Sequence, residues 1–123
     1  MKVFVILSVI VALAAASKPD YYVTGNDHLD VDNVMHNRQT MIGYLNCFID
    51  IGPCDQLAQS YKNNLQDVFE NACSRCNDDQ KHLVHRFLFD MPTFYPIHYI
   101  KLLKKYDPEN KYIHALQDAV WNY

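Results

Sequence analysis

The four cysteines are the residues of this chain whose type and spacing most clearly allow chemistry. Six residues separate Cys47 from Cys54, and two separate Cys73 from Cys76. Such thiols can form disulfides, bind zinc or act as a redox pair. Zinc sites usually place two to four residues between paired thiolates, so the first pair fits poorly, and no βαβ pattern surrounds the second pair. We expect two disulfides, with metal and redox chemistry as the alternatives; four cysteines allow three connectivities, and spacing alone does not choose between them.

The beginning of the chain has the pattern of a secretory signal peptide. Lys2 precedes the apolar run Val3–Leu13, and small residues follow up to a cleavage site after Ala16. We therefore predict a signal peptide at residues 1–16 and a single domain at residues 17–123. This predicts a secreted, extracellular protein, in a compartment where paired cysteines are common. The apolar run is shorter than the roughly 20 residues that a membrane span needs, so we predict no stable membrane insertion.

Hydrophobic residues recur at steps of three and four along most of the chain, and no strand-like alternation is present. This periodicity predicts an all-α fold of about six amphipathic helices. Asp30 and Asp55 are expected N-caps, and Pro96 suits a first helical turn. Pro92 is expected to end the fourth helix. Cys73 is expected to close the third helix, with the Cys73 and Cys76 side chains on the same face of one helical turn. The predicted helices cover about residues 29–35, 37–49, 55–72, 79–91 and 96–106, and a last helix runs from 111 or 112 to about 121.

Composition and missing motifs limit the classes of function. The net charge is −3, without the basic surface that nucleic-acid binding requires, so we predict no nucleic-acid partner. The sequence has no nucleophile elbow, phosphate loop or zinc-protease motif, so we predict no enzymatic activity and no cofactor. His82 and His85, with two aspartates one turn earlier, resemble a helix-face metal site, but helix surfaces produce such pairs by chance, and we predict no metal. Lys101, Lys104 and Lys105 form a basic face, which we interpret first as a solvated surface; an anionic membrane surface or a membrane receptor is the alternative partner.

The cysteine spacing, together with several other positions, resembles the insect chemosensory proteins, the OS-D family of small four-cysteine helical carriers. The resemblance covers nearly all of the chain after residue 16 and is strongest at Lys105-Tyr106-Asp107-Pro108. Further matching positions are Asn37-Arg38, Tyr44, Cys47, Gly52-Pro53-Cys54, Gln80-Lys81 and Lys111-Tyr112. The resemblance implies that the disulfides follow sequence order, Cys47 to Cys54 and Cys73 to Cys76. It also implies six helices around a hydrophobic channel.

The function implied by the resemblance is reversible binding of fatty acids and their derivatives, odorants or pheromone-like compounds inside the channel, by a monomeric carrier. The alternative is a secreted interaction protein with a developmental or defence role, for which ligand binding is secondary. Tyr44 and Tyr99 offer hydroxyl groups to a polar head group. By match to the family's inner positions, the predicted ligand-binding residues are Tyr44, Phe48, Leu65, Val68, Phe69, Val84, Phe87, Tyr99 and Leu103.

Two positions depart from the family pattern near the expected channel mouth. Asn26-Asp27-His28 stands where the family usually has Tyr-Asp-Asn, so an aromatic ring is lost. Tyr99 stands where the family usually has tryptophan, and a phenol is smaller than an indole and carries a hydroxyl group. We therefore expect a wider and more polar mouth than is usual in the family.

Overall fold

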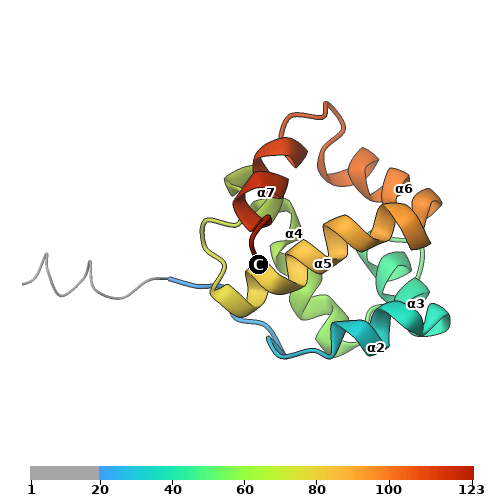
Figure 1. Ribbon diagram of the computed structural model, residues 1–123. Coiled ribbons are helices and arrows are strands. Elements are labelled where there is room, and N and C mark those ends of the chain that lie inside the picture. Colours follow the sequence, from blue (N-terminus) through green and yellow to red (C-terminus); the bar gives the residue numbers. More distant parts are fainter. Residues whose placement is uncertain (1–19) are drawn as a thin grey trace, which may run out of the picture.

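The computed structural model describes residues 20–123, so the predicted signal peptide lies outside the described residues. Within this range the chain is all-helical and contains no strand, as the periodicity predicted (Figure 1). None of the helices in residues 20–123 is long and apolar enough to cross a membrane. The helices are α2 (Val31–His36), α3 (Arg38–Phe48), α4 (Gln56–Asn71), α5 (Asp78–Phe94), α6 (Pro96–Tyr106) and α7 (Ile113–Val120).

Side-chain caps explain where four of the helices begin. Asp30, Asn37, Asp55 and Asn77 each precede a helix and accept a hydrogen bond from the backbone N–H three residues later. At α5 the cap is reciprocal, because Gln80 accepts a hydrogen bond from the Asn77 backbone N–H. Each cap satisfies a donor that the helix itself leaves unpaired, which contributes about 1 kcal/mol. The predicted N-cap roles of Asp30 and Asp55 are confirmed.

Two local predictions were wrong. Pro92 does not end the fourth helix, since α5 continues to Phe94. The proline lies in the last turn, where its missing N–H removes a single bond of the helix. Cys73 and Cys76 do not share a helical turn, because α4 ends at Asn71 and the next two residues adopt left-handed φ angles of 54° and 59°. The chain therefore reverses direction directly after α4, and the cysteine pair lies in this non-helical turn.

Both disulfides have the pairing that the family resemblance implied. Cys47 is bonded to Cys54 across the turn from α3 to α4, and Cys73 is bonded to Cys76 between α4 and α5. No free cysteine remains within the described range, so neither zinc nor redox exchange is needed to explain the four thiols. The bonded cysteines are only seven and three positions apart, so neither disulfide ties together helices that are distant in the sequence.

The core is built around α5, which contacts α2, α6 and α7 (Figure 1). In Figure 1 this helix crosses the molecule, with α2 and α3 near one end and α7 near the other. The most completely buried hydrophobic side chains, one or two from each of four helices, are Leu45, Leu88, Met91, Leu102, Leu116 and Val120. The hydrophobic face of each helix is therefore directed inward.

The two histidines that resembled a metal site hold the end of the chain instead. His82 Nδ1 lies 2.8 Å from the Tyr123 carbonyl oxygen, and His85 Nδ1 lies 2.9 Å from that of Val120. A carbonyl can only accept, so each imidazole donates a hydrogen bond. These contacts fasten α7 to α5. In residues 20–123 no three His, Cys, Asp or Glu side chains lie close enough together to hold a metal ion.

An ion-pair cluster holds the turn that follows α3. Asp50 accepts hydrogen bonds from Lys105 of α6 and from Lys62 of α4. Lys105 also donates to the Phe48 carbonyl oxygen at 2.9 Å, at the end of α3. The hydrogen bonds from Lys105 and then Lys62 lower the pKa of Asp50 from 3.8 to about 2. Three helices thus meet at one exposed carboxylate.

This cluster predicts a stability difference that depends on pH. Because the pKa of Asp50 is lower in the folded protein than in the unfolded chain, its ionised carboxylate stabilises the fold fully at pH values above 3.8. This stabilisation disappears as the pH falls to about 2. We expect Asp50→Asn to have a lower thermal midpoint than the wild type at pH 5 to 7, and the gap should close between pH 4 and pH 2. Asparagine tolerates the left-handed φ of 65° at this position. A gap that stays constant down to pH 2, measured by circular dichroism, would disprove this account.

Candidate functional site

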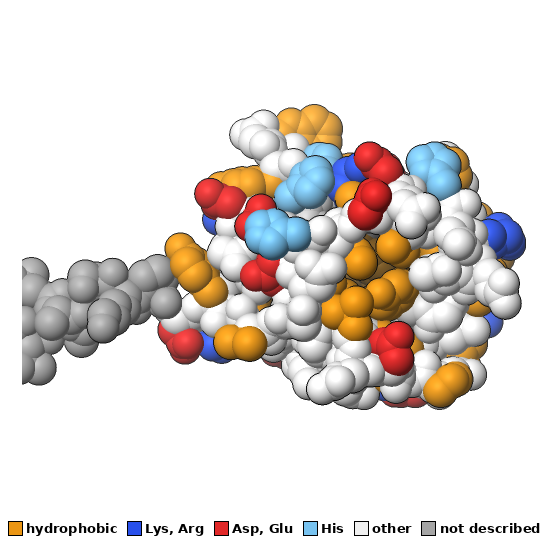
Figure 2. All heavy atoms as spheres, turned by 90° about the horizontal axis from the view of Figure 1, so that it is seen from below, with side chains coloured by type: hydrophobic (Ala, Val, Ile, Leu, Met, Phe, Trp, Pro, Cys, Tyr) orange, Lys and Arg blue, Asp and Glu red, His pale blue; other side chains and the backbone are white. Residues whose placement is uncertain are grey.

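An apolar cavity of about 130 Å³ lies between the N-terminal segment and helices α2, α3, α4 and α5, with one contact from α7. On the face seen in Figure 2 the molecule is hollowed, and hydrophobic side chains gather in the hollow. The wall residues shared by sequence prediction and structure are Tyr44, Phe48, Leu65, Val68, Phe69, Val84 and Phe87. Three consecutive helices, α3 to α5, therefore contribute the predicted part of the wall.

Two predicted residues lie elsewhere. Tyr99 and Leu103 belong to α6, which contributes nothing to this wall, and both side chains are partly buried against the core. Their hydrophobic spacing reflects the packing of α6 on α3, α4 and α5. Burial raises the pKa of the Tyr99 hydroxyl, but that hydroxyl lies outside the cavity. Its predicted contact with a ligand head group has no support from its position.

The sequence did not predict the contribution of the N-terminal segment. Tyr22 is only 8% exposed, although no periodicity marks its surroundings. Its hydroxyl donates to Asp67 Oδ2 at 2.6 Å, and its backbone N–H donates to the Arg75 carbonyl oxygen at 3.2 Å. No local signal distinguishes this tyrosine from its exposed neighbour Tyr21. The other wall residues absent from the predicted set are Thr24, Leu29, Val31, Val34, Met35, Met41, Tyr61, Asn64, Cys76, Gln80, Leu83, Leu88 and Leu116.

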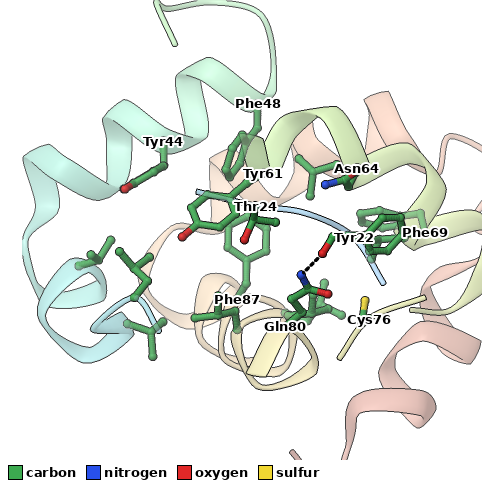
Figure 3. Close-up of a pocket in the computed structure, with 18 of the residues that line it drawn as sticks. Tyr22, Thr24, Tyr44, Phe48, Tyr61, Asn64, Phe69, Cys76, Gln80 and Phe87 are labelled. Carbon is green, nitrogen blue, oxygen red and sulfur yellow. Dashed lines mark hydrogen bonds between the residues drawn. The ribbon is translucent and has the colours of Figure 1, made fainter. Parts of the chain in front are cut away.

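Aromatic rings from three helices form one side of the cavity, as Figure 3 shows. The ring centroids of Tyr44 and Tyr61 are 6.2 Å apart, and Tyr44 lies 6.1 Å from Phe48. Phe48 in turn meets Phe87 edge-on at 5.9 Å. The hydroxyl of Tyr61 donates to the carbonyl oxygen of Asn26. An aromatic ring from α4 therefore lies beside the segment where the family's usual tyrosine is missing.

The tyrosine hydroxyls are the polar groups of this aromatic side. Burial, and then the negative charge of Asp55, raises the pKa of Tyr44. Burial, and then Tyr44 and Asp27, raises the pKa of Tyr61 to about 12. Both phenols are therefore protonated at neutral pH. Tyr61 already donates to Asn26, whereas the Tyr44 hydroxyl makes no hydrogen bond to the part of the chain that the structure describes.

A second polar group, Gln80, is fully engaged in holding the fold together. Its side chain is 5% exposed and donates to the Tyr22 carbonyl oxygen at 2.8 Å, the bond drawn in Figure 3, and to Asp27 Oδ1 at 3.1 Å. Its amide oxygen accepts from the Asn77 backbone N–H. The amide thus ties the N-terminal segment to the start of α5. Tyr44 is the wall residue with a hydroxyl left for a ligand.

The sequence matches one family model and is similar to several known insect proteins. Residues 22–114 match the sequence model of the insect pheromone-binding family, A10/OS-D. The allergen Tha p 1 of Thaumetopoea pityocampa is 30% identical, over 94% of this chain and 92% of its own length. The ejaculatory bulb-specific protein 3 of Drosophila melanogaster is 28% identical, over 85% of this chain and 83% of its own.

Solved structures with the same fold agree with the sequence match. A chemosensory protein in complex with bromo-dodecanol superposes with a TM-score of 0.72 at 26% identity, covering 79% of this chain and 97% of that one. The antennal chemosensory protein A6 from the moth Mamestra brassicae gives 0.64 at 25% identity, covering 76% and 91%. The chain belongs to the insect pheromone-binding family A10/OS-D.

Proposed function

We propose that this protein is a carrier that reversibly binds small apolar ligands in the cavity between α2 and α5. The observation that carries the proposal is the cavity itself, whose wall is almost entirely hydrophobic and aromatic. The related chemosensory protein solved with bromo-dodecanol supports the same use of the fold. Every residue of the wall described above comes from one chain, so a monomer suffices. Binding of this kind needs no catalytic step.

The affinity expected from burial is moderate. Transfer of a methylene group out of water is worth about 0.8 kcal/mol, so a chain of ten gains roughly 8 kcal/mol. Loss of the ligand's freedom removes part of this gain, and a net gain of roughly 5 to 8 kcal/mol corresponds to a dissociation constant of about 1 to 200 μM. A ligand held this weakly is released readily, as a carrier requires.

Occupation of the cavity by a long ligand requires movement of the wall. A volume of about 130 Å³ is similar to that of engineered cavities that hold one benzene molecule, and a chain of twelve carbons needs more room. The two disulfides permit such movement, because they join residues only seven and three positions apart. The wall side chains and α2, a helix of only six residues, are the parts we expect to shift.

Secretion is part of the same proposal. The signal-peptide pattern of residues 1–16 supports it. Expression of the full chain in insect cells tests it. The protein recovered from the medium should begin at Ser17, and retention of the uncleaved chain in the cells would contradict it.

Displacement of a fluorescent probe tests the carrier function. Purified protein, freed of lipid and checked by mass spectrometry, is titrated with N-phenyl-1-naphthylamine and then with 1-dodecanol at pH 7.4. We expect the probe to bind and the alcohol to displace it at micromolar concentration. A folded, lipid-free protein from which dodecanol, methyl dodecanoate and dodecanoate all fail to displace the probe would refute the carrier function.

A further inference from the structure

The wall of the cavity offers no positive charge to a ligand. Among residues 20–123, none of its side chains is lysine, arginine or histidine. Its polar members are neutral: three tyrosines, one threonine and two amides. A carboxylate moved from water into such a site would lose its hydration without gaining a cationic partner, which is costly. An alcohol or an ester needs only one or two neutral hydrogen bonds.

Two acidic side chains are hydrogen-bonded directly to wall residues: Asp67, which accepts from Tyr22, and Asp27. Asp27 accepts hydrogen bonds from two wall residues, Thr24 and Gln80, and from Asn77 at 3.1 Å. Burial opposes its ionisation, but these three hydrogen bonds outweigh burial and hold the pKa of Asp27 below its ordinary value. The carboxylate is therefore negatively charged at neutral pH. Its field disfavours a second anion nearby.

Most lysines and arginines next to a wall residue in sequence are paired with acids. Arg75, next to Cys76, lies over the Tyr22 ring and binds Asp20 and Asp67, and Lys62, next to Tyr61, binds Asp50. Lys81, next to Gln80, instead lies over the Tyr123 ring. Arg86, next to Phe87, binds Asp32 at 2.5 Å and Asp90 at 2.8 Å. His28, next to Leu29, faces Asp79 at 3.7 Å and is largely exposed. Figure 2 shows acidic side chains on opposite sides of the hollow. None of these basic side chains lines the cavity.

The pKa values of the three wall tyrosines are raised by burial and by nearby negative charge. Burial raises the pKa of Tyr22, Tyr44 and Tyr61, and a nearby aspartate adds to the rise in each of them. The aspartates are Asp67, Asp55 and Asp27 respectively. Burial and negative charge therefore both oppose an anion at three points of the wall, whether it is a phenolate or a ligand's carboxylate.

We propose that the cavity selects ligands with uncharged head groups, namely long-chain alcohols, aldehydes and esters, and discriminates against fatty-acid anions of the same chain length. The Tyr44 hydroxyl is the group that hydrogen-bonds the head group. This proposal rests on the carrier function above and narrows its ligand class. It also removes ionised fatty acids from the set that the family resemblance implied.

A comparison of three ligands with one chain length tests the selectivity. Lipid-free protein carrying N-phenyl-1-naphthylamine at pH 7.4 is titrated with 1-dodecanol, methyl dodecanoate and sodium dodecanoate, each below the concentration at which it aggregates. We expect the alcohol and the ester to bind at least tenfold more tightly than the carboxylate. A ratio below ten, or displacement by the carboxylate alone, would overturn the selectivity while leaving the carrier function intact. Displacement by none of the three would overturn the carrier function and the selectivity with it.

Asp27→Asn tests the source of the discrimination. The amide keeps an oxygen that can accept from Thr24 and Gln80 but removes the charge. We expect dodecanoate binding to tighten at least threefold, with dodecanol binding unchanged within twofold. The matched control is Asp79→Asn, which removes an exposed carboxylate that pairs with His28 and lies outside the wall, and it should leave the ratio unchanged. A folded Asp27→Asn protein with the wild-type ratio of dodecanoate to dodecanol dissociation constants would refute the role of Asp27. If the variant does not fold, the three-ligand comparison on the wild-type protein still tests the selectivity.

Discussion

Replacing Asp107 with alanine should lower the free energy of unfolding by about 3 kcal/mol. Asp107 lies in the turn between α6 and α7 and is only 4% exposed. Its carboxylate accepts hydrogen bonds from three successive backbone N–H groups: Lys111 at 2.7 Å, Tyr112 at 3.1 Å and Ile113 at 3.0 Å. Alanine would leave all three donors without their partner at the start of α7, and a buried unpaired donor costs roughly 1 to 3 kcal/mol. The two partly exposed donors can recover bonds to water, which limits the total.

Two matched variants separate the loss of these hydrogen bonds from general effects of substitution in the turn. Asp107→Asn retains one oxygen acceptor, so it should lose only about half of the 3 kcal/mol that Asp107→Ala loses. Glu109→Ala removes an exposed carboxylate whose ion pair with Lys111 spans 3.5 Å, and it should change stability by less than about 0.5 kcal/mol. Urea unfolding followed by circular dichroism at pH 7 measures all three. An Asp107→Ala protein within 1 kcal/mol of the wild type would contradict the role assigned to this carboxylate.

Replacing Val84 with tryptophan should weaken dodecanol binding about 50-fold. Val84 is a partly buried wall residue of α5. An indole ring in place of an isopropyl group would occupy the space of about three methylene groups of the ligand, each worth about 0.8 kcal/mol. The cavity can receive this ring because its volume is about 130 Å³, so the fold should survive. Probe displacement measures the affinity, and thermal unfolding checks the fold.

The control for this substitution carries the same indole outside the cavity. Ile100 is 52% exposed on α6, which contributes nothing to the wall. Ile100→Trp should leave dodecanol affinity within twofold of the wild type. A folded Val84→Trp protein that binds dodecanol like the wild type would place the ligand somewhere other than this cavity.

The predicted and observed cavity walls differ because helical periodicity identifies an apolar face without identifying what that face meets. Tyr44 and Phe48 on α3 and Val84 on α5 border empty space, whereas Leu103 on α6 has the same kind of spacing and meets other side chains. Matching family positions correctly placed seven residues in the wall because those helices keep their place in the fold. The ligand-binding role of those seven remains a proposal, which the Val84 variant tests directly.

Sequence by itself determined the features that depend on near neighbours along the chain. Asp30 and Asp55 cap their helices, and Pro96 begins α6, because a cap or a first turn involves only residues three or four positions apart. The all-α class follows from the same short-range spacing. Even among these local features, the prediction that Pro92 ends the fourth helix was wrong. A proline in the last turn removes only one hydrogen bond, and α5 retains the others.

Only the tertiary structure decided which of these helices enclose space and what charge surrounds that space. Tyr22 reaches Asp67, and Gln80 reaches both Tyr22 and Asp27, across separations of more than forty residues. Contacts of this length depend on how all the helices pack at once, and no local pattern encodes them. They bring two acidic side chains, Asp67 and Asp27, to a cavity wall that itself carries no charged residue. The physical basis for choosing among ligands therefore arises from packing, while the helices that enclose the cavity arise from local sequence.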